Sequence, residues 1–212
     1  KSDTGAMLHG WQRIWMAEEE RHEEYYFKSD TGAMMYGLQR IWGEYYYLDP
    51  DTGARYEGWL DLDGKRYYFK SDTGARLTGW QRIYGEYYYF KSDTAALMYG
   101  LQKIYGNYYY LDPDTGARYE GWLDLDGSRY YFDDVTGVQA IGWTNIDGES
   151  YYFKSDTAAL MYGMQKIWGE YYYLDPDTGA RYEGWLDIDG KRCYFKSDTG
   201  AMLHGWQRIW MA

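Results

Sequence analysis

The segment GWLDLDGKRYYF, residues 58–69, decides the fold of this chain. Asp63-Gly64 lies between two stretches of alternating side chains, a strong signal for a β-hairpin with a two-residue turn. Because side chains alternate across a strand, one face carries Leu60, Leu62, Tyr67 and Phe69, and the other carries Trp59, Asp61, Arg66 and Tyr68. We expect the first face to form the interior. In this register Trp59 lies opposite Tyr68.

Other copies of the segment support this register, because directly opposed residues should be complementary. The opposed pair is an acid and an arginine in Asp61/Arg66, Asp124/Arg129 and Asp187/Arg192. It is a cation facing a tyrosine in Arg40/Tyr45, Arg82/Tyr87, Lys103/Tyr108 and Lys166/Tyr171. The two remaining pairs are Asn145/Ser150 and Arg13/Glu24. Both members change together, which indicates that they are paired.

Copies follow one another along the whole chain as repeats of 21 residues. The repeats start at residues 1, 28, 49, 70, 91, 112, 133, 154, 175 and 196. Those that begin DPDTGARYEGW start at 49, 112 and 175, so every third repeat is of one type. A single hairpin is at best marginally stable, whereas stacked hairpins bury one another's faces. The sequence therefore predicts an all-β fold, a β-solenoid in one continuous array over residues 1–212 without a separate catalytic domain.

The two ends of the chain repeat each other. Residues 1–17 are identical to residues 196–212, and the first repeat also holds an acidic insertion at about residues 16–24. We expect this insertion to lengthen one hairpin or to form a loop at its tip. Trp206–Met211 lacks a return strand, so either the array continues or another copy supplies that strand. Self-association through open ends or aromatic edges is therefore one alternative for the function.

Composition limits the classes of partner. Aromatic residues make up 22% of the chain and the formal net charge is −11, which disfavours nucleic acid and favours neutral or cationic ligands such as sugars or quaternary amines. No apolar run is long enough to span a membrane. The single Cys193 excludes an internal disulfide framework, and we expect a buried unpaired thiol there. No pattern calls for a metal or another cofactor, and DPDTG is better explained as turn chemistry than as a calcium loop.

The stretches GWLDLDGKRYYFKSDTGA (58–75) and IGWTNIDGESYYFKSDTAA (141–159) resemble the cell-wall-binding or choline-binding repeat family. Similar repeats occur in streptococcal glucan-binding proteins and in large clostridial toxins. The resemblance covers essentially the whole chain. It implies a solenoid with three hairpins per turn. It also implies non-catalytic, extracellular attachment to cell-wall choline, to glucans or to host glycans.

The resemblance also implies where a choline ligand would bind. The box would contain the Trp after Gly, an aromatic residue that opens the second strand's triplet, and an aromatic residue of the next hairpin. Trp80 and Tyr87 fit this pattern, with Tyr109 or Tyr110 from the next repeat. The DPDTG repeats place Arg66, Arg129 and Arg192 at the second position, where a cation would repel a quaternary ammonium. This pattern favours a glycan over choline.

Each Trp after Gly has a structural explanation as well, because aromatic rings mostly supply buried area between hairpins. The middle residue of each tyrosine triplet should likewise be core, and the outer two are ligand candidates. The densest aromatic edge is our preferred glycan or partner surface. Its residues are Tyr36, Trp42, Tyr45 and Tyr47, with the copies Tyr99, Tyr105, Tyr108, Tyr110 and Tyr162, Trp168, Tyr171, Tyr173. The sequence thus predicts a module that binds cell-wall or host glycans, with a self-associating array and choline binding as alternatives.

Overall fold

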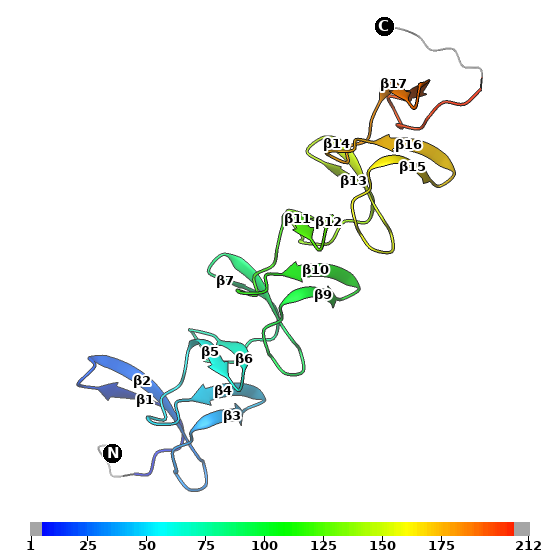
Figure 1. Cartoon of the computed structure of the whole chain (residues 1–212). Helices are drawn as coiled ribbons and strands as arrows, with labels where there is room; N and C mark the ends of the chain where they lie inside the picture. The colour runs from blue at the N-terminus through cyan, green and yellow to red at the C-terminus, as the bar shows by residue number, and fades with distance from the viewer. Residues whose placement is uncertain (1–5, 206–212) are drawn as a thin grey trace. The chain divides into compact units, whose positions relative to one another are not determined.

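The computed structural model describes residues 6–205. Trp206–Met211, for which we expected a strand from elsewhere, lies outside the described residues. The chain forms two compact units: one comprises Lys1–Gly100 with Leu111–Arg118, and the other comprises Leu101–Tyr110 with Tyr119–Ala212. The same kind of hairpin builds both units (Figure 1).

Strands account for all regular structure in the described residues, which confirms the all-β prediction. They pair as nine antiparallel hairpins, each a separate two-stranded sheet. The strands are β1 (Gly10–Met16), β2 (Arg21–Phe27), β3 (Gly37–Ile41), β4 (Glu44–Leu48), β5 (Gly58–Leu62), β6 (Lys65–Phe69), β7 (Gly79–Ile83), β8 (Glu86–Phe90), β9 (Gly100–Ile104), β10 (Asn107–Leu111), β11 (Gly121–Leu125), β12 (Ser128–Phe132), β13 (Gly142–Ile146), β14 (Glu149–Phe153), β15 (Gly163–Ile167), β16 (Glu170–Leu174), β17 (Gly184–Ile188) and β18 (Lys191–Phe195). No helix capable of crossing a membrane is found between residues 6 and 205.

The predicted register of β5 and β6 is confirmed. Trp59 lies opposite Tyr68 and Asp61 opposite Arg66, and the equivalent pairs recur in the other hairpins. Both turn residues have positive φ, 51° at Asp63 and 69° at Gly64, as a type I′ turn requires. The twist of this turn matches that of the strands, so the turn itself sets the register.

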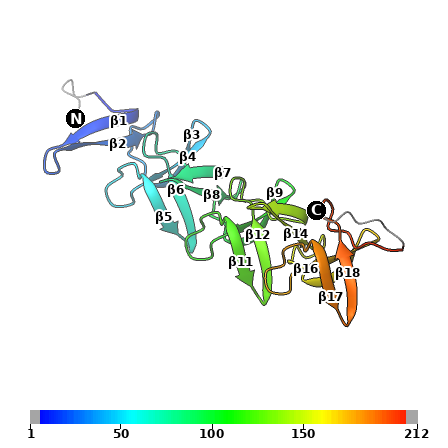
Figure 2. The same ribbon diagram turned by 90° about the horizontal axis from the view of Figure 1, so that it is seen from above.

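The acidic insertion lengthens the first hairpin, as expected. β1 and β2 each have seven residues, whereas the strands of the other hairpins have five (Figure 2). Met16 pairs with Arg21 at the end of the ladder, which leaves Ala17 and the three glutamates 18–20 in the turn. Arg21 Nη2 binds Glu23 Oε1 at 2.6 Å beside this turn. The extra residues therefore extend an existing element.

The DPDTG segments are turns. Oδ1 of Asp49 accepts hydrogen bonds from the backbone N–H groups of Asp51 and Thr52, at 3.0 and 2.8 Å, and from the Thr52 hydroxyl at 3.0 Å. The same bonds recur around Asp112 and Asp175. These donors stabilise the carboxylate, led by the backbone N–H of Thr52, and hold the pKa of Asp49 below its ordinary value. The prediction of turn chemistry is confirmed.

The core of each hairpin lies at the end of its second strand. Phe69 is 1% exposed, and its counterparts Leu48, Phe90, Leu111, Phe132, Phe153, Leu174 and Phe195 are equally enclosed. The expectation of a single interior face is wrong, however, because Tyr68 on the opposite face is only 7% exposed. Both faces are packed, since the ring of Trp59 lies against Tyr88 of the next hairpin. Cys193, expected to be buried, is a half-buried free thiol.

A second set of backbone hydrogen bonds joins residues 31 positions apart. The N–H of Arg76 donates to the carbonyl oxygen of Tyr45 at 2.8 Å, and the N–H of Leu97 donates to that of Arg66 at 2.8 Å. The other pairs of this kind are Glu24/Arg55, Tyr87/Arg118, Tyr108/Gln139, Arg129/Leu160, Ser150/Arg181 and Tyr171/Met202. Eight of the nine described hairpins are thus bound to the segment 31 residues farther along, which in the regular array leads into the second hairpin after it.

Candidate ligand-binding site

Four of the Trp residues that follow a strand-opening Gly, Trp11, Trp59, Trp122 and Trp143, lie at the centre of an aromatic cluster. Trp59 is flanked by its cross-strand partner Tyr68 and by Tyr88 of the next hairpin, both with ring centres at 5.0 Å. We call this the Trp59 cluster. The Trp11 cluster (Trp11, Tyr26, Tyr46), the Trp122 cluster (Trp122, Tyr131, Tyr151) and the Trp143 cluster (Trp143, Tyr152, Tyr172) repeat it. The predicted packing of these Trp residues between consecutive hairpins is confirmed.

A fourth ring joins three of these clusters from the tip of the next hairpin. Trp42 lies 6.4 Å from Tyr26, Tyr84 lies 6.5 Å from Tyr68, and Trp168 lies 6.2 Å from Tyr152. These tip residues and Tyr105 are 79–85% exposed, and their φ angles of 51–52° lie in the left-handed region that bulky residues disfavour. Equivalent tips carry Asp63, Asp126, Asp147 and Asp189. Neither burial nor backbone preference explains an aromatic residue at such a position.

Guanidinium groups of the chain itself lie over most of the central Trp rings. Cζ of Arg66 is 5.0 Å from the centre of Trp59, Arg129 is 5.1 Å from Trp122, and Arg192 is 5.2 Å from Trp185. Arg181 lies 5.9 Å from Trp143. The ring quadrupole attracts a cation at these distances. We call this position over the Trp ring the cation seat, because the arginines demonstrate that a cation fits there.

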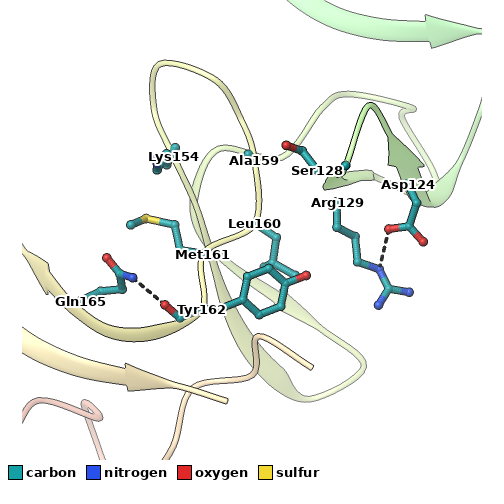
Figure 3. A pocket seen from close by; sticks show the side chains of 10 residues that line it. Asp124, Ser128, Arg129, Lys154, Ala159, Leu160, Met161, Tyr162 and Gln165 are labelled. Atoms are coloured by element: carbon teal, nitrogen blue, oxygen red, sulfur yellow. Dashed lines mark hydrogen bonds and ion pairs between the residues drawn. The ribbon is translucent and has the colours of Figure 1, made fainter. Parts of the chain in front are cut away.

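Arg129, which lies over Trp122, also lines a cavity of about 630 Å³ (Figure 3). Arg129 reaches into it from β12, and its Nε lies 3.5 Å from Oδ1 of Asp124. Leu160 and Tyr162 line the opposite side. They also pack against the hydrophobic cluster that Trp122 joins, so the cavity and the aromatic cluster share a wall.

The Trp11 cluster differs from the others in the residue that stands beside its seat. Glu24 occupies the strand position that Arg66 holds in the Trp59 cluster, opposite Arg13. Its carboxylate pairs with Arg55 at 2.5 Å, and Arg55 in turn binds Glu57 at 2.6 Å and the Thr73 carbonyl oxygen at 2.9 Å. Among the residues that the structure describes, no cationic side chain lies over the Trp11 ring. Arg55, the counterpart of the Arg181 that lies over Trp143, is paired with Glu24 instead, and we call the position over Trp11 the open seat.

The tyrosines that open the triplets are covered by cations of the chain. Tyr45 lies between Arg40 at 5.7 Å and Arg76 at 4.5 Å. Tyr87 lies between Arg82 at 5.4 Å and Arg118 at 4.3 Å. Lys103 lies over Tyr108 and Lys166 over Tyr171, at 5.4 and 5.3 Å. The predicted facing of cation and tyrosine is confirmed, and it gives these four predicted ligand residues an internal partner.

The other predicted ligand residues divide into packed and exposed groups. Tyr47 packs against Tyr56 and Phe69 of the following repeat at 6.0 and 6.1 Å, and Tyr110 and Tyr173 make the equivalent contacts with the repeats that follow them. Trp42 and Trp168 are the exposed tip residues described above. Trp80 contacts Tyr89 at 5.2 Å, and the two residues expected to complete its box, Tyr109 and Tyr110, belong to the second compact unit.

Sequence reasoning missed the Trp11 cluster and the arginines at Arg76 and Arg118. The sequence paired Arg13 with Glu24, as it paired Asp61 with Arg66, but did not connect Glu24 with a site at Trp11. Residues 31 positions apart do vary together in the sequence, which could have revealed these arginines. When the earlier residue is Glu, Tyr or Ser, the later one is often Arg, and when the earlier residue is Arg, the later one is Leu. Burial raises the pKa of Tyr88 and of Tyr151, which keeps these cluster rings neutral.

Family models place these hairpins in a known class. The choline-binding repeat model matches residues 77–120 and 140–183, and the putative cell wall binding repeat model matches residues 57–72. These stretches match choline-binding and cell-wall-binding repeats, so the predicted resemblance to this family is confirmed. No curated protein matches its sequence.

Solved structures from Streptococcus pneumoniae share the fold. Choline binding protein F is 24% identical with a TM-score of 0.77, over 95% of this chain and 82% of that chain. Its structure in the presence of a peptidoglycan analogue gives 25% identity and a TM-score of 0.78, with the same coverage. The structure of CbpJ gives 22% identity and a TM-score of 0.67, over 92% of this chain and 94% of that chain.

Proposed function

We propose that this chain is a non-catalytic module that holds a cell-wall polymer through its quaternary ammonium groups, with the Trp11 cluster as the binding site. The observation that carries the proposal is the cation seat. Arg66 and Arg129 lie over Trp59 and Trp122, so the same fold at Trp11 can take a cation from outside. The family match and the net charge of −11 support this choice.

The chemistry of the Trp11 seat suits a trimethylammonium group. Tyr26 and Tyr46 stand at 5.1 and 5.0 Å from the indole, and Trp42 extends the aromatic wall beyond Tyr26. A quaternary ammonium has no hydrogen-bond donor, so it gains from ring faces rather than from polar partners. Glu24 adds a negative charge on the same hairpin.

Calorimetric titration of the whole chain with choline tests the proposal. Trp11→Leu removes the seat and introduces a residue that the chain itself uses at Leu38 and Leu101. We expect Trp11→Leu to abolish binding at this site. Trp185→Leu is the control, because Arg192 already lies over Trp185, and we expect it to leave choline binding unchanged. Equal choline affinity in the wild type and in Trp11→Leu would contradict the proposal.

The exposed tip aromatics favour a second function, stacking on the sugar rings of the same polymer. Trp42, Tyr105 and Trp168 hold a disfavoured backbone conformation with most of their surface in water. An apolar sugar face would cover them, and a second copy of the chain is the alternative. Glycan-array binding that is lost in Trp42→Asp and Trp168→Asp supports the glycan. Concentration-dependent association without glycan binding, measured by light scattering, would contradict it.

Two finer features belong to the same proposal. The contacts from each hairpin to the next, and the bonds between residues 31 positions apart, support a solenoid with three hairpins per turn. A module that holds a wall polymer acts outside the cell. Trp80 and Tyr87 stay secondary candidates for ligand contact, because Arg118 lies over Tyr87.

A further inference from the structure

The guanidinium of Arg129 stands where an external cation would bind the Trp122 cluster. It lies 5.1 Å from the centre of the indole, which Tyr131 and Tyr151 flank at 5.1 and 5.0 Å. Arg66 repeats this arrangement over Trp59 in the other compact unit. A seat occupied by an arginine of the same hairpin is therefore a property of the DPDTG type of hairpin.

Two contacts hold this arginine in position, the aromatic face of Trp122 and an ion pair with Asp124. Nε of Arg129 lies 3.5 Å from Asp124, and the two side chains are 39% and 76% exposed. Ion pairs in water contribute little. Without the guanidinium, the seat would keep the Trp122 ring, the Asp124 carboxylate and direct access from the cavity of about 630 Å³ (Figure 3).

The type of residue found 31 positions later depends on which side chain stands beside the Trp ring. Leu97 and Leu160 follow Arg66 and Arg129, so the residue 31 positions later adds no cation beside either guanidinium. Arginine stands at the later position instead in Glu24/Arg55, Tyr45/Arg76, Tyr87/Arg118 and Ser150/Arg181. Each of these six pairs contains one arginine, which is the earlier residue in two pairs and the later residue in four. Which of the two positions carries the cation therefore differs between hairpins.

We propose that Arg66 and Arg129 are the resident ligands of the Trp59 and Trp122 seats, and that these residues determine which hairpins can bind an external quaternary ammonium. The inference rests on the proposed function, because it assumes that such a group binds an open seat. In the DPDTG hairpins, the guanidinium of the chain itself occupies the position that an external cation would take at Trp11. A change at one arginine opens a site.

Titration of the full chain with choline and with tetramethylammonium tests this inference. In Arg129→Ser, which introduces the residue found at Ser150, we expect the number of bound cations to rise by one per chain. Arg129→Lys retains a cation and should show no added site. Asp124→Asn in the Arg129→Ser background should weaken the new site, because the remaining carboxylate is removed.

The outcomes separate the two proposals. Added binding in Arg129→Ser without binding by the wild type supports the inference and overturns the Trp11 site. Wild-type binding with no added site in a folded Arg129→Ser chain overturns the inference alone. Aromatic circular dichroism establishes folding, and Arg66→Ser offers an independent second variant in the other compact unit. Failure of both folded variants to gain a site would refute the resident role.

Discussion

The guanidinium of Arg118 lies 4.3 Å from the centre of the Tyr87 ring, and its backbone N–H donates to the carbonyl oxygen of Tyr87 at 2.7 Å. Two residues 31 positions apart are therefore joined through both backbone and side chain. Arg76 and Tyr45 repeat the relationship at 4.5 Å. The hairpins are held together by pairs of this kind as well as by the Trp clusters.

The Arg118 and Tyr87 side chains should be energetically coupled. We expect a double-mutant cycle with Arg118→Ala and Tyr87→Ala to give a coupling of about 1 kcal/mol, as a half-exposed cation–π contact provides. Urea unfolding measures it. Tyr108 and Gln139 share the backbone bond without a guanidinium, so their cycle is the control. Equal coupling in the two cycles would show that the cation contributes nothing.

The tip aromatics should reduce stability. Trp42 has a φ of 52°, and a bulky residue in this region is destabilised by about 1 kcal/mol relative to Asn or Asp. Trp42→Asn should therefore raise the unfolding midpoint while weakening polymer binding. Asp63→Trp is the matched reverse change and should lower the midpoint. A lower midpoint in Trp42→Asn would mean that the contact with Tyr26 outweighs the strain.

Tyr25 should make stability depend on pH in the alkaline range. Burial, together with donation to Glu23 Oε2 at 2.7 Å, raises the pKa of Tyr25 from 10.0 to about 12. The folded state holds this proton more tightly, so the stabilisation is complete below pH 10.0 and is lost as the pH rises towards about 12. The phenolate absorbance difference between the wild type and Tyr25→Phe measures this step. A midpoint near 10.0 would contradict the buried hydrogen bond.

Much of the fold could be predicted, because it depends on local chemistry. Asp63-Gly64 sets the turn. The complementary cross-strand pairs Asp61/Arg66 and Arg40/Tyr45 indicate the register without any knowledge of the neighbouring hairpins. The assignment of a single interior face failed for Tyr68, because its burial depends on Tyr84 and Tyr88 of the next hairpin.

The binding site could be predicted only in part. The sequence identified Arg66 as incompatible with an external cation, and the structure supplies the physical reason, since its guanidinium lies over Trp59. It aligned Glu24 with Arg66 but did not show that Arg55, from a later repeat, pairs with Glu24. The arginine over Tyr87, Arg118, belongs to a later repeat. Its separation of 31 residues from Tyr87 follows from the packing of the hairpins and not from the repeat length of 21 residues.

The central claim is that an external cation binds a Trp seat only where the chain leaves it open. Closing the open seat tests this claim most directly. Glu24→Arg with Arg55→Leu converts the first hairpin to the arrangement of Arg66 and Leu97. Calorimetry with choline should then show one bound cation fewer than in the wild type, with folding retained. An unchanged number of bound cations in the folded double variant would contradict the claim.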